Sequence, residues 1–391
     1  MSATRGTAGT ARIEWAGGQM PVLRSIRARL SADQPLAGVR VGACLHVTAE
    51  TANLVLALRA GGAEVHLCAA NPYVTQHDVA EALGEHVHVG DYREGLAAVA
   101  AAEPDLVLDD GAELIAALHG SGLRGATEET RSGLVHLRTL DVRCPVLAVN
   151  EAASERGIND RFGTGQSALD GIVGATHMLL AGQTVVVLGY GWSGRGVALR
   201  ARGAGASVIV CEVDPLRALE ARMEGFEVLP SLEAAAGGDV FITVTGSRDV
   251  LRAEHFTRMK DGAVLANAGH FDVEISLADL RALAGDRHAQ VLPLVEQYEV
   301  EDGRRLNLLA RGQVVNLAAA QGHPAAVMDV SFALQALSAV HLASAELAPG
   351  VQAVPSAIDD EVARLKLLSL GVEIDVETPG QQAYRGRWSP A

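Results

Sequence analysis

Short runs of apolar, often β-branched residues alternate along the chain with longer Ala- and Leu-rich stretches. A short run bounded by polar residues predicts a strand, and the longer stretch after it predicts a helix. In the first half the expected strands are 39–45, 64–68, 106–108 and 145–149, with helices at 50–59 and from His77 onward. Strand–helix units in series predict a parallel sheet that binds ligands at its carboxyl edge. The polar residues at these strand ends are His46, Asp109, Asp110 and Asn150.

A second series of such units begins at Gln183. Its expected strands are 184–188, 208–211, 241–245 and 263–266, with a helix at 197–204 after the first of them. We therefore expect an α/β fold of two doubly wound parallel-sheet domains, the second a Rossmann domain inserted in a substrate-binding domain. The expected parts are the substrate-binding domain at 1–176, the Rossmann domain at 177–322, a helical return at 323–375 and a shortened tail at 376–391.

A glycine-rich turn follows the first strand of the second series and opens its helix. Gly189 permits the tight turn, Gly191 lets a pyrophosphate approach the backbone, and Gly194 allows close packing of helix on strand. Glu212 ends the next strand, where a carboxylate accepts both ribose hydroxyls and repels a 2′-phosphate. The motif predicts NAD rather than NADP as cofactor, although Arg217 nearby weakens that preference. The alternative is an ordinary glycine turn in a buried strand–helix unit.

Composition narrows the possible functions further. The 391 residues are 49% hydrophobic but only 4% aromatic, so the core must be built from Ala, Val and Leu. A net charge of −15 argues against nucleic-acid binding, which needs a basic surface. The four cysteines lie far apart, as in a reduced cytoplasmic protein. We expect no membrane span, no signal peptide and no metal site, and His66, His86 and His88 carry no motif.

Five segments carry a more specific signal and are spread over the chain. They are 44–52 (CLHVTAETA), 109–111 (DDG), 128–130 (EET), 259–274 (MKDGAVLANAGHFDVE) and 316–324 (NLAAAQGHP). They resemble the CLHMTxETA, DDGGD, EETTTG, MKDxAIxxNxGHFDxEI and NLGxAxGHP segments of the S-adenosyl-L-homocysteine hydrolase family. The resemblance extends from about Met20 to Tyr384.

The resemblance implies an enzyme that uses NAD as a catalyst and an adenosine-like nucleoside as substrate. In that family the 3′-hydroxyl is oxidised, which makes the C4′ hydrogen acidic. A base removes this proton, and the 5′ substituent is then expelled. Water adds to the resulting alkene, and reduction of the 3′ ketone regenerates NAD.

The family motifs also imply roles for particular residues. His46 and Asp110 would handle protons near C4′ and C5′, and His270 would lie near the nicotinamide and the ribose. Glu155 and Asn159 occupy the catalytic positions beside the 3′-hydroxyl. The implied substrate-binding residues are Thr48, Glu50, Glu129, Asn150, Phe271, His323 and Met328. The expected NAD-binding residues are Thr130, Ser132, Asp160, Gly189, Gly191, Trp192, Ser193, Gly194, Glu212, Thr245, Gly246, Asn267, Gly269 and Asn316.

One segment departs from the family pattern where the chemistry occurs. The family has NDSxxKxxFDN, whereas residues 150–160 read NEAASERGIND. Glu155 therefore stands where the family has a lysine, and Asn159 stands where it has an aspartate. In the family that pair positions the 3′-hydroxyl and takes its proton. A buried Glu155 with a suitable pKa would have to serve as the base instead.

The chain also ends before the KPDHYRY tail of the family. That tail passes a lysine and a tyrosine to a neighbouring subunit's NAD. We expect a homo-oligomer, and the shortened tail leaves dimer and tetramer open.

Three hypotheses follow for the function. The first is a divergent enzyme that applies the family's redox-neutral chemistry as a nucleoside dehydratase, because the residues beside the 3′-hydroxyl are rewritten. The second is ordinary hydrolysis of S-adenosyl-L-homocysteine. The third is a catalytically inactive NAD-binding regulator, suggested by the missing lysine.

Overall fold

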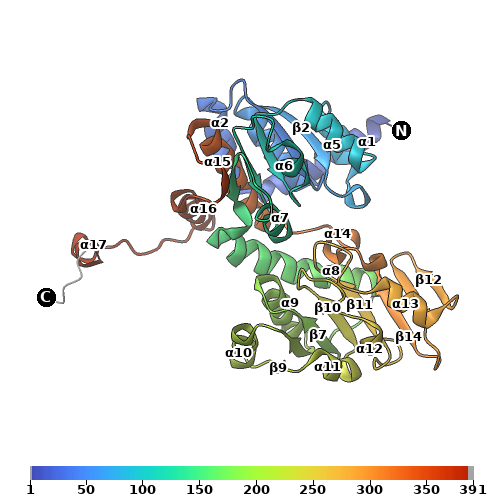
Figure 1. Cartoon of the computed structure of the whole chain (residues 1–391). Coiled ribbons are helices and arrows are strands. Elements are labelled where there is room, and N and C mark those ends of the chain that lie inside the picture. The colour runs from blue at the N-terminus through green and yellow to red at the C-terminus, as the bar shows by residue number, and fades with distance from the viewer. Residues whose placement is uncertain (1, 386–391) are drawn as a thin grey trace.

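The computed structural model describes residues 2–385, which form two α/β lobes and a C-terminal arm (Figure 1). Each lobe is built on its own sheet with helices on both faces, which confirms the predicted fold class. The upper lobe in Figure 1 contains both the first residues of the chain and the long helix α15 (Ala325–Ser344). The lower lobe consists of the intervening segment, so one domain is inserted in the other.

The first lobe contains a seven-stranded, fully parallel sheet in the order β15-β6-β5-β4-β1-β2-β3. Its strands are β1 (Arg40–Leu45), β2 (Glu64–Ala69), β3 (Val87–His88), β4 (Leu106–Asp109), β5 (Gly125–Glu128), β6 (Pro145–Ala148) and β15 (Gly350–Ala353). Its helices are α1 (Ser2–Gly18), α2 (Pro21–Asp33), α3 (Ala49–Ala60), α4 (His77–Leu83), α5 (Tyr92–Ala101), α6 (Glu113–Leu118), α7 (Arg131–Leu137), α15 and α16 (Ser356–Ser369). The arm ends in α17 (Pro379–Arg385).

The second lobe contains an eight-stranded sheet in the order β12-β13-β14-β11-β10-β7-β8-β9. Its strands are β7 (Thr184–Leu188), β8 (Ser207–Cys211), β9 (Glu227–Val228), β10 (Val240–Thr243), β11 (Val264–Asn267), β12 (His288–Leu292), β13 (Val295–Glu299) and β14 (Arg305–Leu309). Its helices are α8 (Thr164–Thr176), α9 (Trp192–Gly203), α10 (Pro215–Met223), α11 (Ser231–Gly237), α12 (Ala253–Phe256), α13 (Leu277–Ala284) and α14 (Val315–Ala318). The edge strands depart from a purely parallel sheet, because β13 runs antiparallel to both β12 and β14.

Alternation along each strand supplies apolar side chains to both faces of a sheet. In β4, Leu106 and Leu108 face the core under α2, α3 and α15, whereas Val107 faces the core under α5 and α6. In β7, Val185 and Val186 divide between two cores in the same way. The continuous apolar strands predicted from the sequence are therefore the buried strands of two three-layer domains.

Two expectations about the segment after 322 need correction. It contains the strand β15 as well as helices, and β15 pairs with β6 in parallel through Val351 and Val146. No apolar run long enough to cross a membrane was expected. The 20-residue α15 is nevertheless long and apolar enough to do so, judged by length and composition alone. The helix is 72% buried over its most apolar window because it packs inside the first lobe. It is therefore a core helix.

Asp329 on α15 attaches this helix to two others. Its side chain is completely buried and accepts the backbone N–H groups of Val22 (3.2 Å) and Leu23 (2.8 Å), which begin α2. Lys366 on α16 forms an ion pair with it at 2.9 Å. The carboxylate thus satisfies amide groups that no turn of α2 could satisfy.

We expect Asp329→Ala to lower the free energy of unfolding by about 3 kcal/mol, because it leaves two buried amides without their acceptor and removes the ion-pair partner of the partly buried Lys366. Chemical denaturation measures this. Asp360→Ala on the exposed side of α16 is the control, with an expected change within about 0.5 kcal/mol. Equal effects of the two substitutions would contradict the assigned role of Asp329.

Candidate active site between the two domains

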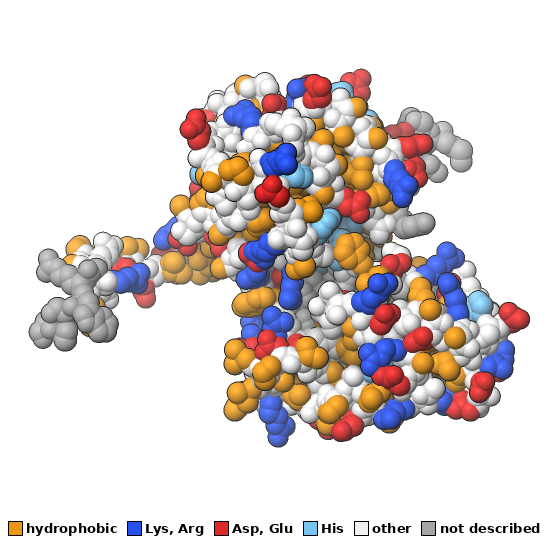
Figure 2. All heavy atoms as spheres, viewed as in Figure 1, with side chains coloured by type: hydrophobic (Ala, Val, Ile, Leu, Met, Phe, Trp, Pro, Cys, Tyr) orange, Lys and Arg blue, Asp and Glu red, His pale blue; other side chains and the backbone are white. Residues whose placement is uncertain are grey.

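Two histidines from different lobes meet at one aspartate. His46 follows β1 and Asp110 follows β4, so both lie at the carboxyl edge of the first sheet. His46 Nε2 lies 3.4 Å from Asp110 Oδ2, and His270 Nδ1, from the loop after β11, lies 3.7 Å from Asp110 Oδ1. Figure 2 shows the hollow between the lobes, with histidine side chains at its edge. The predicted group of His46, Asp110 and His270 therefore comes together in space.

The pKa of His46 is lowered by burial, although the charge of Asp110 acts in the opposite direction. A largely neutral imidazole beside a carboxylate can accept a proton at neutral pH. The Asp109 carboxylate stabilises the turn that carries Asp110, because it accepts the N–H groups of Asp110 (3.0 Å) and Ile115 (2.8 Å). These hydrogen bonds fix the backbone position of Asp110.

Glu129 lies just after β5 and accepts hydrogen bonds from two side chains of α15. Ser331 donates to its Oε1 at 2.8 Å, and Gln335 donates to its Oε2 at 3.1 Å. Burial and the charge of Asp110 raise the pKa of Glu129 to about 7. Sequence reasoning missed Ser331 and Gln335, and the available signal was their four-residue spacing, which puts two polar side chains on one side of an apolar helix.

Glu155 and Asn159 lie on a π-helical segment, η3 (Glu155–Gly163), that precedes α8. Glu155 is fully buried, and the Asn159 amide donates to its Oε1. Burial, together with the charges of Glu129 and Asp160, raises the pKa of Glu155 well above its ordinary value. Single π-helical turns occur often at functional sites. Here the turn aims two polar side chains at the space beside Glu129.

The amide of Asn159 connects this pair to the predicted entrance residue. His323 Nδ1 lies 2.5 Å from Asn159 Oδ1, and His323 Nε2 lies 3.2 Å from the Thr164 hydroxyl. Burial lowers the pKa of His323 to about 4, so the ring is neutral near pH 7. A contact between residues 159 and 323 joins segments that are far apart in the sequence and that no local pattern connects.

The remaining predicted substrate residues lie around these groups. Thr48 caps α3 by accepting the N–H of Thr51, and burial raises the pKa of Glu50 on the same helix. Phe271 stays 50% exposed, with its ring edge-on to His270. Asn150 is buried and hydrogen-bonds to Asp160, and Met328 packs against the core of the first lobe.

The glycine-rich turn has the shape that a dinucleotide requires. Gly189 has a φ of 103°, and a Cβ on Gly194 would lie 2.0 Å from the Gly189 carbonyl oxygen. The Glu212 carboxylate accepts the Tyr190 N–H at 2.6 Å, so it is held against the turn. Trp192 is 44% exposed at the start of α9, and Gly191 and Ser193 lie beside it.

A second group of predicted NAD residues lies beyond β10 and β11. The Glu274 carboxylate accepts the N–H groups of Thr245 (2.9 Å) and Gly246 (2.8 Å), and a Cβ on Gly269 would lie 1.9 Å from its Oε1. Asn267 bridges to the carbonyl oxygens of Phe271 and Gly312. Glu274 was not predicted as a site residue, although it ends one of the motifs quoted above.

These residues fit NAD. Backbone packs closely on Gly189 and Gly194, whereas a Cβ on Gly191 would meet only Arg217 Nη1, at 3.8 Å, so the backbone of Gly191 is open to a pyrophosphate. The buried Asn316 Oδ1 has no hydrogen-bond partner among the described residues, so it is available as an acceptor. Three other predicted NAD residues lie on the first lobe. Thr130 caps α7, with Ser132 donating to its hydroxyl, and Asp160 has a pKa raised to about 7 by burial despite nearby Arg156.

Direct backbone packing holds the π-helix against the Rossmann lobe. A Cβ on Gly196 of α9 would lie 1.8 Å from the carbonyl oxygen of Arg161, and one on Gly165 would meet the backbone of Gly196 at 2.7 Å. The segment with Glu155 and Asn159 is therefore tied to the helix that begins at the glycine-rich turn. The predicted catalytic residues of this segment and the glycine-rich turn are thus joined through packed backbone.

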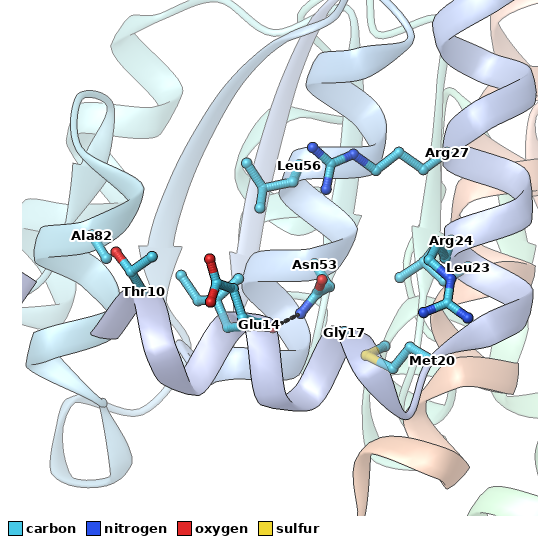
Figure 3. Close-up of a pocket in the computed structure, with 11 residues that line it drawn as sticks. Thr10, Glu14, Gly17, Met20, Leu23, Arg24, Arg27, Asn53, Leu56 and Ala82 are labelled. Carbon is cyan, nitrogen blue, oxygen red and sulfur yellow. Dashed lines mark hydrogen bonds between the residues drawn. The ribbon is translucent and has the colours of Figure 1, made fainter. Parts of the chain in front are cut away.

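A separate cavity of about 390 Å³ lies in the first lobe between α1, α2 and α3, away from these residues. Figure 3 shows Glu14, Arg24 and Arg27 around it, with Asn53 donating to the backbone of α1 at 2.9 Å. None of the predicted site residues lines it.

Comparison with known proteins agrees with this arrangement. Residues 2–122 match the family described as S-adenosyl-L-homocysteine hydrolase, and residues 160–322 match its NAD binding domain. An adenosylhomocysteinase of Aquifex aeolicus is 51% identical over 97% of this chain and 96% of its own. An S-inosyl-L-homocysteine hydrolase of Methanopyrus kandleri is 49% identical over 96% of this chain and 94% of its own.

Among solved structures, a dipicolinate synthase subunit from Bacillus halodurans has a similar fold. It superimposes with a TM-score of 0.52 at 14% identity and covers 79% of this chain and 100% of its own. The family matches and the identity to these relatives show that the protein is an NAD-dependent member of the S-adenosyl-L-homocysteine hydrolase family.

Proposed function

We propose that the protein cleaves a thioether nucleoside of the S-adenosyl-L-homocysteine class by elimination and addition of water. The observation that carries the proposal is the convergence of His46 and His270 on Asp110 from opposite lobes. Relatives with 51% and 49% identity are named as hydrolases of S-adenosyl- and S-inosyl-L-homocysteine. Since these two names differ in the purine, the nucleobase of this substrate is either adenine or hypoxanthine.

Each group has a distinct task in this proposal. Bound NAD would supply reversible hydride transfer at the 3′ carbon of the sugar. Glu129, held by α15, would bind ribose hydroxyls. Asp110 and His46 would remove the C4′ proton and protonate the leaving group at C5′, since both lie at the same strand ends. Phe271, at the mouth of the hollow, would limit access of water.

Glu155 is the least ordinary member of the site. Burial and the charges of Glu129 and Asp160 raise the pKa of Glu155, so its carboxylate would be a stronger base than a free one and would accept the proton of the 3′-hydroxyl as hydride leaves for NAD. Asn159 orients it through the amide. A carboxyl group at this position supplies no positive charge, so the 3′ oxygen would be polarised by hydrogen bonds rather than by a cation.

We expect the wild-type protein to release homocysteine from S-adenosyl-L-homocysteine, and Asp110→Asn to lower kcat by a factor of about 100 or more, because proton transfer contributes about 10²- to 10⁴-fold. A thiol-trapping assay measures the release. Asp170→Asn on the exposed face of α8 is the control and should leave kcat unchanged. The proposal fails if no thiol appears with either the adenosine or the inosine thioether.

A nucleoside dehydratase is the second candidate, and the Glu155–Asn159 pair supports it. Such an enzyme would stop at the alkene after water leaves from a terminal hydroxymethyl group. The same preparation is incubated with adenosine and with ketohexose nucleosides, and mass spectrometry seeks the loss of one water. Loss of water without thiol release would favour the dehydratase. Neither product would favour an inactive NAD-binding regulator.

The buried carboxyl groups also predict how stability depends on pH. The pKa values of Glu129 and Asp160 are raised to about 7, so the folded protein binds these protons more tightly than the unfolded chain does. Their contribution to stability is complete below the unfolded pKa and is lost as pH rises through the folded value. A tenfold difference in proton affinity between the folded and unfolded states corresponds to about 1.4 kcal/mol.

We therefore expect the free energy of unfolding to fall between about pH 5 and about pH 8. Glu155→Gln should make this fall smaller, because it removes a buried carboxyl group beside Glu129 whose own pKa is raised. Denaturation at both pH values with saturating NAD tests this. Glu151→Gln is the control, since Arg138 already lowers the pKa of Glu151 and the residue titrates below this range. A profile that rises with pH would contradict the prediction.

We also propose that the protein forms a homo-oligomer through its C-terminal arm and that it is cytoplasmic. Figure 1 shows the arm leaving the body of the molecule. Its side chains Val372, Ile374 and Val376 are exposed, which is costly for an isolated chain. The four cysteines are free and buried, as suits a reducing compartment.

Light scattering after gel filtration should give the mass of a dimer or tetramer. Ile374→Asp combined with Val376→Asp should shift the protein to smaller species, because it charges an apolar contact. Asp375→Asn between them should not. A monomeric wild type would rule the interface out.

A further inference from the structure

Three histidines and a glutamate gather on one face of the first sheet. Glu64 and His66 are two residues apart on β2, so their side chains share a face. His86 precedes the edge strand β3 and His88 ends it, and β3 pairs in parallel with β2 through Leu67–Val87 and Cys68–His88. Glu64 begins its strand, whereas His46 follows the end of β1. The cluster therefore lies toward the amino ends of the parallel strands, whereas the candidate active site lies at their carboxyl ends.

The side chains of this cluster are close enough to share one ion. Glu64 Oε1 lies 2.8 Å from His66 Nε2, and the rings of His66 and His86 are 4.3 Å apart between centroids. One ligand atom from each of the three lies within 4.8 Å of the other two. Ligands at about 2.0 Å from a tetrahedral zinc ion are separated by about 3.3 Å, so small side-chain rotations would close the site.

Two further observations point to a ligand. His86 has a φ of 66°, a left-handed conformation that is uncommon for residues other than glycine, and it brings the ring next to His66. His88 stacks at 6.5 Å on His66, and its buried Nε2 has no hydrogen-bond partner among the described residues. Three imidazole rings therefore lie side by side at this end of the two strands.

The nearby arginines are directed elsewhere. Arg40 donates to the Ala102 carbonyl oxygen at 2.8 Å and lies 3.9 Å from Glu103. Arg59 donates to the carbonyl oxygens of Leu83 and Glu85. Glu64 therefore makes its hydrogen bond with His66 and none with these arginines, although the charge of Arg40 still acts on it.

We propose that Glu64, His66 and His86 bind a divalent transition-metal ion, with zinc as the preferred occupant. Two imidazoles and one carboxylate suit Zn²⁺, Ni²⁺ or Cu²⁺ and disfavour Mg²⁺ and Ca²⁺, which require oxygen ligands. A bound ion would join β2 to β3 across the sheet edge. Because β3 has only two residues, such a clip would hold an edge strand that few ladder hydrogen bonds secure.

Titration calorimetry of the NAD-loaded protein with zinc chloride tests the site. Wild type should bind one equivalent more than His66→Ala/His86→Ala, and His86→Ala alone should weaken that equivalent by about 10- to 100-fold or more, since even second-sphere losses cost this much. Counting by difference separates this ion from any zinc at the active-site histidines. Magnesium chloride should give no heat from this site.

Three controls make the result decisive. His288→Ala removes an exposed histidine that stacks on Tyr298 in the other lobe and should leave the zinc equivalents unchanged. The double variant should keep the wild-type turnover, which shows that it is folded. Glu64→Gln, at an exposed position, gives the same test if the double variant does not fold. Equal zinc stoichiometry and affinity in wild type, the double variant and Glu64→Gln would overturn the proposal.

Discussion

The site depends on keeping several carboxyl groups buried within reach of one another. Glu129, Glu155 and Asp160 all have raised pKa values, and each faces at least one of the others or Asp110. Charging them together in a medium of low polarity is unfavourable, so protons must remain in the cluster near neutral pH. The chain has only two lysines, and neither Lys260 nor Lys366 lies there. Arg131 and Arg156 act on Asp160, whereas hydrogen bonds from neutral groups act on Glu129 and Glu155.

The surrounding architecture supplies those hydrogen bonds. Helix α15 directs Ser331 and Gln335 at Glu129, and the π-helix directs the Asn159 amide at Glu155. His323 then fixes the other side of that amide. A buried polar network of this kind specifies one arrangement, because leaving any member unpaired is costly. The substrate edge of the site is thus made from residues of the first lobe and from both segments where the chain crosses between the lobes.

Close backbone contact couples this network to the cofactor lobe. Gly165 and Gly196 let the segment after the π-helix touch α9, whose first turn is the glycine-rich loop. A side chain at either glycine would separate the two elements. Glu155 therefore lies on a segment that packs directly against the helix of the dinucleotide site.

The strand–helix alternation, the glycine-rich turn with Glu212 and the family motifs were readable from the sequence, because each depends on local periodicity or on short spacing. They identified both sheets and brought His46, Asp110, Glu129 and His270 into one group. The strands β3, β5, β9, β12, β13, β14 and β15 were not predicted. In β15, three half-buried residues and one exposed residue form a strand only because β6 offers its edge.

Three contacts of the site join residues that are 29 to 206 positions apart. They are the hydrogen bond from Gln335 to Glu129, the contact between Asn159 and His323, and the hydrogen bond from Thr245 to Glu274. The sequence by itself determined which chemical groups are present and at which strand ends they lie. Only the tertiary structure decided which of them share a dry environment, because desolvation and charge coupling depend on distance in space.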